Sequence, residues 1–392
     1  MNWVDLLIVV AVATYALSGY RNGAVVGTLS IVGFMAGALI GGQLAHPVGT
    51  ALASGRAQIS LGLACVLGCA VIGQLAGVAL ARPLRRRITH SAGRQADAGL
   101  GSVLSAIGVL VVVWMLALPL ASAPYPSVSR QVRQSTLVHG VDTVMPAPMR
   151  SVYASLRGLV DRTGFPQVFG ALQPSRIRGV DPPDDALTRS PVVRSVRASV
   201  VKIRSAAPDC DRRTEGSGFV YAAGRVMTNA HVVAGSDSVT VEGLDGPRDA
   251  TVVLYDSDRD VAVLAVDGLN VPALRFAGRA SGSGADAIVA GYPEDGPFRA
   301  DAGRIRDRER AVGADIYGGA GVSRQVYAVR ARVQPGNSGG PLLGTDGRVL
   351  GVVFATAVDS PGTGYALTAA EVGSSAAAGR SADARVSTQG CT

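Results

Sequence analysis

The sequence has little charge for its length. Of its 392 residues, 17% are charged, whereas soluble globular proteins average about a quarter. Hydrophobic residues make up 48% of the chain, and the mean hydropathy is +0.29. A disordered chain needs high charge and low hydropathy, so this composition excludes one. At roughly 100–200 residues per domain, the length predicts two or three structural units.

The shortage of charge is concentrated in the first third of the chain. Residues 1–123 contain two acidic residues, Asp5 and Asp97, and seven arginines, a balance of +5. Residues 124–392 hold 30 basic and 27 acidic residues, a balance of +3. A nucleic-acid partner would need a basic face on a folded domain. Because the basic excess belongs to the apolar part, we expect no nucleic-acid partner.

Lysine is almost absent. Lys202 is the one lysine of the chain, against 36 arginines. This ratio is typical of a GC-rich bacterial genome and predicts no mechanism by itself.

Four long apolar runs account for the missing charge. Each has about 18–23 residues, enough for a helix to cross a hydrocarbon core of about 30 Å. The runs are Trp3–Tyr20, Ala24–Leu44, Ile59–Ala81 and Leu100–Ala121. Glycines spaced four apart give two of them faces for close helix packing, at positions 33, 37 and 41 and at positions 73 and 77. We therefore predict a segment of four transmembrane helices over residues 1–122.

The arginines predict how this segment is oriented. Five of them lie in the loop 82–99, between the third and fourth runs, so this loop should face the cytoplasm. Four spans then return the chain to the outer side. We expect everything after about residue 122 to be extracytoplasmic, starting with a linker over residues 123–185. Met149–Asp161 has helical spacing within this linker, and Pro182–Asp185 is typical of an exposed boundary.

The pattern changes period after about residue 190. Short β-rich runs alternate with Gly, Asp and Asn turns, which predicts an all-β barrel or sandwich over residues 186–392. The runs are Ser199–Ile203, Gly218–Tyr221, Arg225–Thr228, Val239–Val241, Thr251–Tyr255, Val261–Val266, Ala287–Ala290, Val326–Arg330, Val349–Ala355 and Gly364–Leu367.

A glycine-rich loop around Ser338 is the strongest chemical signal of this part. The sequence Gln334–Leu342 (QPGNSGGPL) lets the backbone turn tightly and approach a substrate carbonyl. The amides of Gly336 and Ser338 would then point together at a developing oxyanion. A serine hydroxyl is a weak nucleophile and needs an adjacent base.

His231 is the candidate base, because it is the only histidine after residue 139. An imidazole in that role needs a carboxylate to fix its tautomer. Asp260 is favoured because it opens an apolar strand, although Asp256 and Asp258 are close rivals on spacing. Each signal is weak alone, but the order His, Asp, Ser within one β-rich unit predicts a serine hydrolase.

The four cysteines separate into two pairs. Cys65 and Cys69 lie four residues apart in the third apolar run, where packing is their expected role. Cys210 and Cys391 would lie in an oxidising compartment, where a disulfide persists. The alternative is two unrelated free thiols. Two cysteines without a histidine at ligand spacing predict no metal site, and nothing predicts a cofactor.

At these motifs the sequence resembles the chymotrypsin-like serine proteases, and most closely their bacterial Deg/HtrA branch. The resemblance rests on TNAHVV, DVAVL and GNSGGPL and covers about residues 195–372. It implies two six-stranded β-barrels with the triad His231, Asp260 and Ser338 in the cleft between them. It also implies a substrate pocket whose walls come from the stretch before the nucleophile and from the strand 353–357. The residues expected there are Arg332, Phe354, Ala355 and Thr356, with Arg332 favouring an acidic or polar side chain.

The apolar segment is similar to the membrane part of the colicin V production protein family. Asp5, Tyr20–Gly23 and Asp97–Gly99 stand where that pattern has its polar marks. Four spans joined to a triad protease resemble the membrane-anchored acid-resistance proteases of actinobacteria. This resemblance implies a periplasmic endopeptidase on the cytoplasmic membrane that processes cell-envelope proteins under acid and oxidative stress. It also implies a Cys210–Cys391 disulfide.

Two other classes of function remain open at this point. The chain would be a membrane scaffold or transporter if the β-rich part had lost activity. It would be a redox sensor if Cys210 and Cys391 carried the function. The intact triad pattern favours proteolysis over both.

Overall fold

The computed structural model describes residues 2–52, 56–85, 91–121, 126–145, 178–210, 212–319, 321–357 and 360–391. The chain divides into two compact units, which are described separately. One unit comprises Met1–Ala123 and Ser127–Arg162, and the other comprises Pro124–Pro126 and Thr163–Thr392. The predicted helix Met149–Asp161 and arginines 86 and 87 lie outside the described residues.

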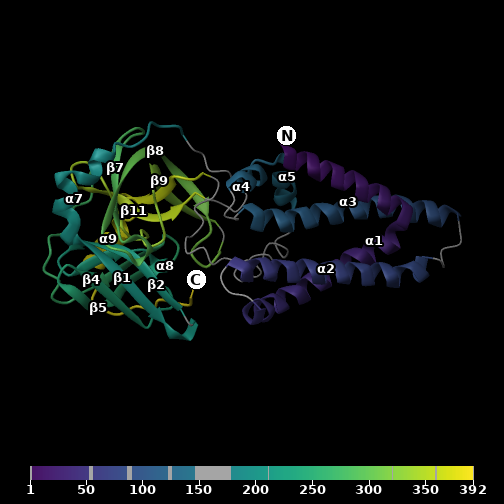
Figure 1. The fold of residues 1–392 in the computed structure, drawn as a ribbon, viewed down its shortest axis with the longest axis horizontal. Coiled ribbons are helices and arrows are strands. Elements are labelled where there is room, and N and C mark those ends of the chain that lie inside the picture. The colour runs from purple at the N-terminus through teal and green to yellow at the C-terminus, as the bar shows by residue number, and fades with distance from the viewer. Residues whose placement is uncertain are drawn as a thin grey trace. The chain divides into compact units, whose positions relative to one another are not determined.

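The first unit is helical (Figure 1). Its described elements are α1 (Trp3–Leu52), α2 (Arg56–Arg85), α3 (Ser91–Ala121), α4 (Pro126–Arg133) and α5 (Thr136–Val144). Helix α1 holds the first two apolar runs and is interrupted at Gly23, whose φ of 78° is not helical. A φ in this range suits glycine, which has no Cβ to clash with the backbone. The interruption therefore falls in Tyr20–Gly23, one of the polar segments singled out in the sequence.

Glycines bring α1 and α2 into backbone contact. A Cβ built on Gly33 would overlap the carbonyl oxygen of Gly73, and one built on Gly37 would overlap that of Cys69. A Cβ on Gly77 would likewise overlap the carbonyl oxygen of Leu29. Without side chains at these positions, the two helices approach closely and gain van der Waals contact along their length. The predicted glycine faces are confirmed.

The two acidic residues of the apolar region are buried and hydrogen-bonded. Asp5 accepts from the Ser135 hydroxyl at 2.6 Å and from the Leu137 amide at 3.1 Å. Asp97 accepts at 3.2 Å from the amide of Val25, just after the interruption at Gly23. Free amides at a helix start need acceptors, so Asp97 joins α3 to the second half of α1.

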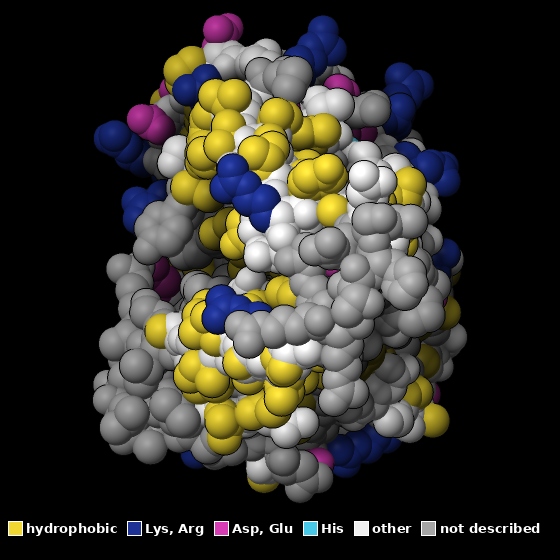
Figure 2. Space-filling view, turned by 90° about the vertical axis from the view of Figure 1, so that its right-hand side faces the viewer, with side chains coloured by type: hydrophobic (Ala, Val, Ile, Leu, Met, Phe, Trp, Pro, Cys, Tyr) yellow, Lys and Arg dark blue, Asp and Glu magenta, His cyan; other side chains and the backbone are white. Residues whose placement is uncertain are grey.

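Apolar side chains cover the outside of this unit. Large hydrophobic side chains on α1–α3 are exposed, among them Leu6, Ile72 and Leu80 at 61–69%. Figure 2 shows hydrophobic side chains gathered on the face that looks towards the viewer. Two stretches are long and apolar enough to cross a membrane, Trp3–Leu44 and Gln95–Ala117, and Gly68–Pro83 is a shorter apolar helix. The described residues thus give two candidate spans and not the four predicted.

The second unit is built mainly of β-strands (Figure 1). Its strands are β1 (Val200–Ala207), β2 (Arg212–Ala222), β3 (Arg225–Thr228), β4 (Ser238–Gly243), β5 (Gly246–Asp256), β6 (Val261–Ala265), β7 (Asp286–Gly291), β8 (Arg299–Gly313), β9 (Val322–Ala331), β10 (Pro341–Leu343), β11 (Val349–Thr356) and β12 (Thr363–Thr368). Its helices are η1 (Asp185–Arg189), α7 (Pro191–Val196), η2 (Arg197–Ser199), η3 (Pro208–Cys210), α8 (Ala230–Val233), η4 (Pro293–Asp295) and α9 (Gly373–Arg380).

These strands close into two six-stranded antiparallel barrels. The first has the order β1-β2-β3-β6-β5-β4, and the second has the order β10-β11-β12-β9-β8-β7. The predicted pair of barrels is confirmed, and each of the ten predicted β-rich runs overlaps a strand. The prediction omitted β8 and β10. Strand β8 is rich in charged residues, five of them consecutive at positions 306–310, so the hydrophobic signal of a strand is weak.

One hydrophobic core joins the two barrels. It combines Phe219 and Met227 of the first barrel with Ile288 and Val352 of the second, all fully buried. Buried apolar area of this kind resists sliding of one barrel against the other. The loops that face each other across the barrels are therefore held at a fixed distance.

A disulfide fixes the end of the chain to the first barrel. Cys391 is bonded to Cys210, as predicted, across a sequence separation of 181 residues. The preceding residues lie along the loop after α8, where the Gly235 amide donates to the Thr388 carbonyl at 3.0 Å. Gly235 has a φ of +65°, and a Cβ there would press on Cys391. The C-terminal tail is thus packed directly behind the helix that carries His231.

We expect Cys391→Ser to lower the free energy of unfolding of the β-rich unit by up to about 5 kcal/mol. The reason is that the bridge closes a long loop in the unfolded chain, which costs that chain entropy. Thermal unfolding of the purified protein with and without reductant measures the effect. Cys65→Ser and Cys69→Ser serve as controls, because these thiols form no disulfide. A Cys391→Ser protein that melts like the parent under oxidising conditions would contradict the expectation.

Candidate active site

His231 lies in α8, directly after β3, and its side chain is 8% exposed. Its Nδ1 atom is 2.8 Å from Oδ2 and 3.0 Å from Oδ1 of Asp260. The backbone amide of His231 also donates to Asp260 Oδ1, at 2.9 Å. A carboxylate only accepts, so the ring proton lies on Nδ1 and the lone pair on Nε2. Nε2 is buried and has no hydrogen-bond partner among the described residues.

Asp260 is held in an uncommon backbone conformation. It is fully buried in the turn between β5 and β6, and its φ is +62°. Residues other than glycine rarely adopt this region, and such strain is concentrated at functional sites. The Asn229 side-chain amide donates to the Asp260 carbonyl at 2.8 Å and supports the turn. The strained turn directs the carboxylate back towards His231.

The two rival aspartates face other groups. Asp256 pairs with Arg259, whose Nη1 is 3.1 Å from Asp256 Oδ2. The side chain of Asp258 is exposed, and its carbonyl accepts at 2.6 Å from Nε of the buried Arg324. Of the three aspartates, Asp260 alone is hydrogen-bonded to His231 among the described residues. The geometry thus favours Asp260 over Asp256 and Asp258 as the carboxylate partner of His231, a choice that sequence spacing alone left open.

Ser338 lies in the loop between β9 and β10, and its side chain is buried. Hydrogen bonds within the loop fold it tightly: the Asn337 amide donates to the Gln334 carbonyl, and the Gln334 amide donates to Asn337 Oδ1. Gly336 has a φ of +89° and lies against the Tyr292 carbonyl, with no room for a Cβ. The loop therefore needs its glycine at that position.

Two amides of this loop have no internal partner. The amides of Asn337, Gly339 and Gly340 donate to backbone carbonyls. Among the described residues, by contrast, the Gly336 and Ser338 amides donate no hydrogen bond. These are the two amides predicted to bind an oxyanion. Donors that are fixed in place and unpaired suit a charge that develops only during a reaction.

Strand β2 of the first barrel contacts both the Ser338 loop and the segment that carries His231. The Ser217 amide of β2 donates to the Ser338 carbonyl at 2.8 Å. A Cβ built on the adjacent Gly216 would lie 2.7 Å from the Val232 side chain and 3.2 Å from the Ser338 carbonyl. Gly216 thus separates the nucleophile loop from the residue after His231. In the described part of the chain, no hydrogen bond joins His231 Nε2 to the Ser338 hydroxyl. Such bonds are often long before substrate binds.

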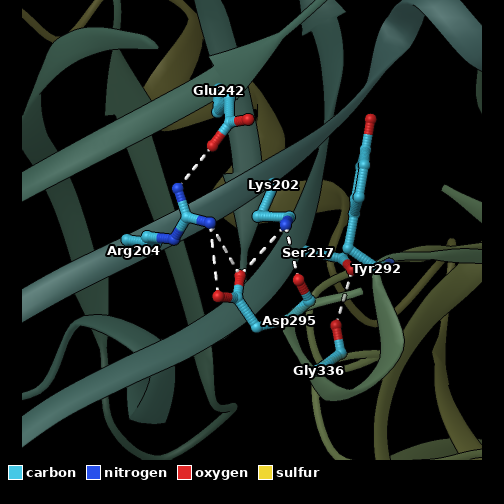
Figure 3. A network of polar contacts seen from close by, with 7 residues as sticks. All are labelled: Lys202, Arg204, Ser217, Glu242, Tyr292, Asp295 and Gly336. Atoms are coloured by element: carbon cyan, nitrogen blue, oxygen red, sulfur yellow. Dashed lines mark hydrogen bonds and ion pairs between the residues drawn. The ribbon is translucent and has the colours of Figure 1, made fainter. Parts of the chain in front are cut away.

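A polar network below the loop was not predicted from the sequence (Figure 3). The Ser217 hydroxyl donates to the Gly336 carbonyl at 2.6 Å and accepts from the Tyr292 amide at 2.8 Å. Tyr292 leads into the turn η4, where Lys202 Nζ donates to the Asp295 carbonyl at 2.7 Å. The only sequence feature that could have pointed to this network is Lys202, the one lysine of the chain.

Lys202 fixes this turn by charge as well. Its Nζ is 3.0 Å from Asp295 Oδ1, and the ammonium lies 5.5 Å from the centre of the Tyr292 ring. The lysine hydrogen bond, helped by Arg204, holds the pKa of Asp295 below its ordinary value. Arg204 also contacts Glu242 of β4 (Figure 3). The first barrel thereby holds η4 of the second barrel in place.

The residues predicted to bind substrate fall into two groups. Arg332 and Thr356 line a cavity of about 870 Å³ on the second barrel. Phe354 and Ala355 are fully buried in the hydrophobic core, and their side chains do not line this cavity. Only the backbone of these two residues is left for contact with a substrate.

Comparison with known proteins gives the class of protein. Residues 216–352 match the trypsin-like peptidase domain, and residues 4–146 match colicin V production protein. A DegP-like periplasmic serine endoprotease of Halomonas elongata is 37% identical over 150 residues, which cover 36% of this chain and 29% of that protein. With the two barrels, these matches define a serine endopeptidase joined to an apolar helical segment.

The similarity to one protein extends over nearly the whole chain. Serine protease Rv3671c of Mycobacterium tuberculosis is 42% identical over 373 residues, which cover 95% of this chain and 94% of that protein. The crystal structure of the active form of the Rv3671c protease is 50% identical, with a TM-score of 0.54, and covers 55% of this chain and 96% of that one. The chain belongs to the family of serine protease Rv3671c.

Asp260→Asn is expected to reduce kcat about 10⁴-fold, because an amide would hold the imidazole in the wrong tautomer. Asp258→Asn is the matched control, and its activity should stay near that of the parent. Hydrolysis of a casein substrate by the two purified variants measures the difference. If Asp258→Asn lost as much activity as Asp260→Asn, the carboxylate would be wrongly assigned.

Proposed function

We propose that Ser338, His231 and Asp260 are the nucleophile, the general base and the orienting carboxylate of this endopeptidase. The observation that carries the proposal is the buried contact of Asp260 with Nδ1 of His231, which leaves Nε2 as an unpaired acceptor. An acceptor of this kind can take a proton from a serine hydroxyl. The contact of the Ser338 loop with β2, beside the segment that carries His231, supports the same assignment.

The proposed reaction is hydrolysis of a peptide bond through an acyl-enzyme. Ser338 attacks the carbonyl carbon while His231 Nε2 accepts the hydroxyl proton and returns it to the leaving amine. Asp260 stabilises the imidazolium that forms in between. Water then attacks the acyl-enzyme by the same route, and Ser338 is regenerated. The amides of Gly336 and Ser338 stabilise the oxyanion in both halves, which is supported by their lack of internal partners.

Ser338→Ala should reduce kcat on the order of 10⁶-fold, since the triad acts as a unit and its loss is largely complete. Cleavage of casein by purified full-length protein measures the rate. A fluorophosphonate probe should label the parent and not the variant. Labelling of the variant, or cleavage at the parent rate, would refute the nucleophile assignment and favour an inactive scaffold.

The helical unit is proposed to cross the membrane four times. A straight helix over the 42 residues Trp3–Leu44 would be about 63 Å long, twice the thickness of a hydrocarbon core. The interruption at Gly23 divides this stretch into two pieces, each long enough for one span. Helix α2 supplies the third span and α3 the fourth. The exposed apolar side chains of these helices would then face the acyl chains of the bilayer.

The catalytic unit is proposed to lie in the periplasm, where it cleaves cell-envelope proteins under acid and oxidative stress. The arginine-rich segment 82–99, which holds the end of α2 and the start of α3, supports this orientation, because positively charged connections between spans stay in the cytoplasm. The Cys210–Cys391 disulfide also supports it, since disulfides persist in oxidising compartments. The stress role follows from the resemblance to actinobacterial acid-resistance proteases.

Reporter fusions test the orientation. Alkaline phosphatase is expected to be active when fused at residue 123 or residue 392, because it folds only outside the cytoplasm. A fluorescent protein inserted at residue 88, within the arginine-rich loop, should fluoresce, because that loop stays inside. Phosphatase activity at residue 88 would contradict the proposed topology.

A further inference from the structure

The turn that carries Asp260 is bound from the second barrel. It joins β5 to β6 and comprises residues 257–260. Arg324 of β9 donates from Nε to the Asp258 carbonyl at 2.6 Å and from Nη2 to the Ala314 carbonyl at 2.9 Å. The first bond reaches the turn, and the second fixes the guanidinium to the chain just after β8. Arg324 thus joins the turn of Asp260 to the second barrel.

A second contact binds the same turn through Glu371. Its Oε1 is 3.3 Å from Nε of Arg259, and its Oε2 accepts from the Gln325 amide of β9 at 2.9 Å. Arg259 is exposed and also pairs with Asp256, so water and the competing carboxylate weaken this contact. The buried contact of Arg324 is therefore the stronger of the two.

Arg324 is an uncommon residue for a protein core. It is 1% exposed, and both of its hydrogen bonds given above go to uncharged carbonyls. Within the described part of the chain, no ion pair neutralises it. Burial lowers the pKa of its guanidinium, whereas nearby carboxylates, with Asp260 acting most strongly, oppose that lowering. A buried charge is costly unless other groups compensate it, and Asp260 is the main compensating carboxylate here.

The backbone conformation that Arg324 supports is strained. Asp260 has a φ of +62°, which a turn keeps only when its surroundings hold it there. From the first barrel, the Asn229 side chain donates to the Asp260 carbonyl at 2.8 Å. From the second barrel, Arg324 holds the peptide two residues earlier. If that support were removed, the turn would relax and the carboxylate would leave its place 2.8 Å from Nδ1 of His231.

We propose that Arg324 is a positioning residue for the proteolytic reaction: its buried guanidinium holds the turn so that the Asp260 carboxylate stays on Nδ1 of His231. The side chain is too deeply buried to contact a substrate, and it does not line the cavity of the second barrel. It therefore acts through Asp260. The inference rests on the proposed function, because it takes Asp260 as the orienting carboxylate of the triad.

The test replaces Arg324 by methionine, which keeps most of the volume but has neither charge nor donors. Cleavage of a fluorogenic casein-derived peptide by the full-length protein in detergent gives kcat and KM separately. We expect Arg324→Met to lower kcat about 10²-fold, the size of a misplacement of about 1 Å at a catalytic group. KM should stay within about twofold of the parent, because no contact with substrate is removed.

A double variant separates an effect through Asp260 from a general loss of structure. In the Asp260→Asn background, Arg324→Met should lower kcat by less than about threefold, because the interaction that Arg324 supports is already lost. A residue that only stabilises the fold would lower kcat by the same factor in both backgrounds. Arg324→Lys is the second variant. It keeps the charge and can reach one carbonyl, so kcat should fall less than with methionine and show the same dependence on Asp260.

Arg304→Met is the matched control. Arg304 is a partly buried arginine of β8 that pairs with Asp286 at 2.7 Å, and it does not line the cavity. Its variant loses an ion pair inside the second barrel and should keep the parent kcat. Thermal unfolding shows which variants are folded at the assay temperature, and Arg324→Lys carries the comparison if Arg324→Met is not.

Two results would overturn the inference and leave the triad assignment intact. One is a parent-like kcat in the folded Arg324 variants, and the other is an equal loss of kcat with and without Asp260→Asn. If Asp260→Asn alone kept the parent kcat, the proposed function would fail, and the inference with it.

Discussion

Ser217 makes the hydrogen bonds on which the geometry of the candidate site depends. Its amide donates to the Ser338 carbonyl, its hydroxyl donates to the Gly336 carbonyl and accepts from the Tyr292 amide, and its carbonyl accepts from the Thr228 hydroxyl. One fully buried residue of the first barrel thus fixes the backbone on both sides of Asn337 in the Ser338 loop of the second. The amides of Gly336 and Ser338 stay unpaired and fixed in position only if the neighbouring carbonyls form other hydrogen bonds. Ser217 supplies those hydrogen bonds to the carbonyls of Gly336 and Ser338.

Three of the four described non-glycine residues with positive φ lie in turns around the candidate site. Asp260, Glu294 and Asp295 all have positive φ values between 52° and 62°, which costs residues with a Cβ on the order of 1 kcal/mol or more each. At Asp295, the ion pair with Lys202 offsets part of this cost, and the Glu294 amide donates to the Pro335 carbonyl. Contacts between the barrels therefore maintain conformations that an isolated turn would not keep.

Sequence predicted the parts of this site that depend on short motifs. The Ser338 loop needs glycine at positive φ, so its pattern is visible in the sequence. The barrel strands with longer apolar runs were also found, whereas β10, an apolar strand of three residues, was missed. Lys202 and Ser217 were missed because their partners, Asp295 and Gly336, lie 93 and 119 residues away. Strand β8 was missed because its outward side chains are charged and its pairing with β7 and β9 comes from the closed barrel.

The first third of the chain has few charged residues, and its two acidic side chains are buried with hydrogen-bond donors close by. In the helical unit Asp5 and Asp97 are each buried against backbone amides, since an unpaired polar group among apolar side chains is costly. In the protease unit Arg306 is buried with an unsatisfied Nε. Buried polar groups of folded proteins are usually hydrogen-bonded, so such an atom is an exception. The same physical rule therefore explains why Asp5 and Asp97 are each paired with backbone amides and marks the Nε atom of Arg306 as one of the exceptions among the described residues.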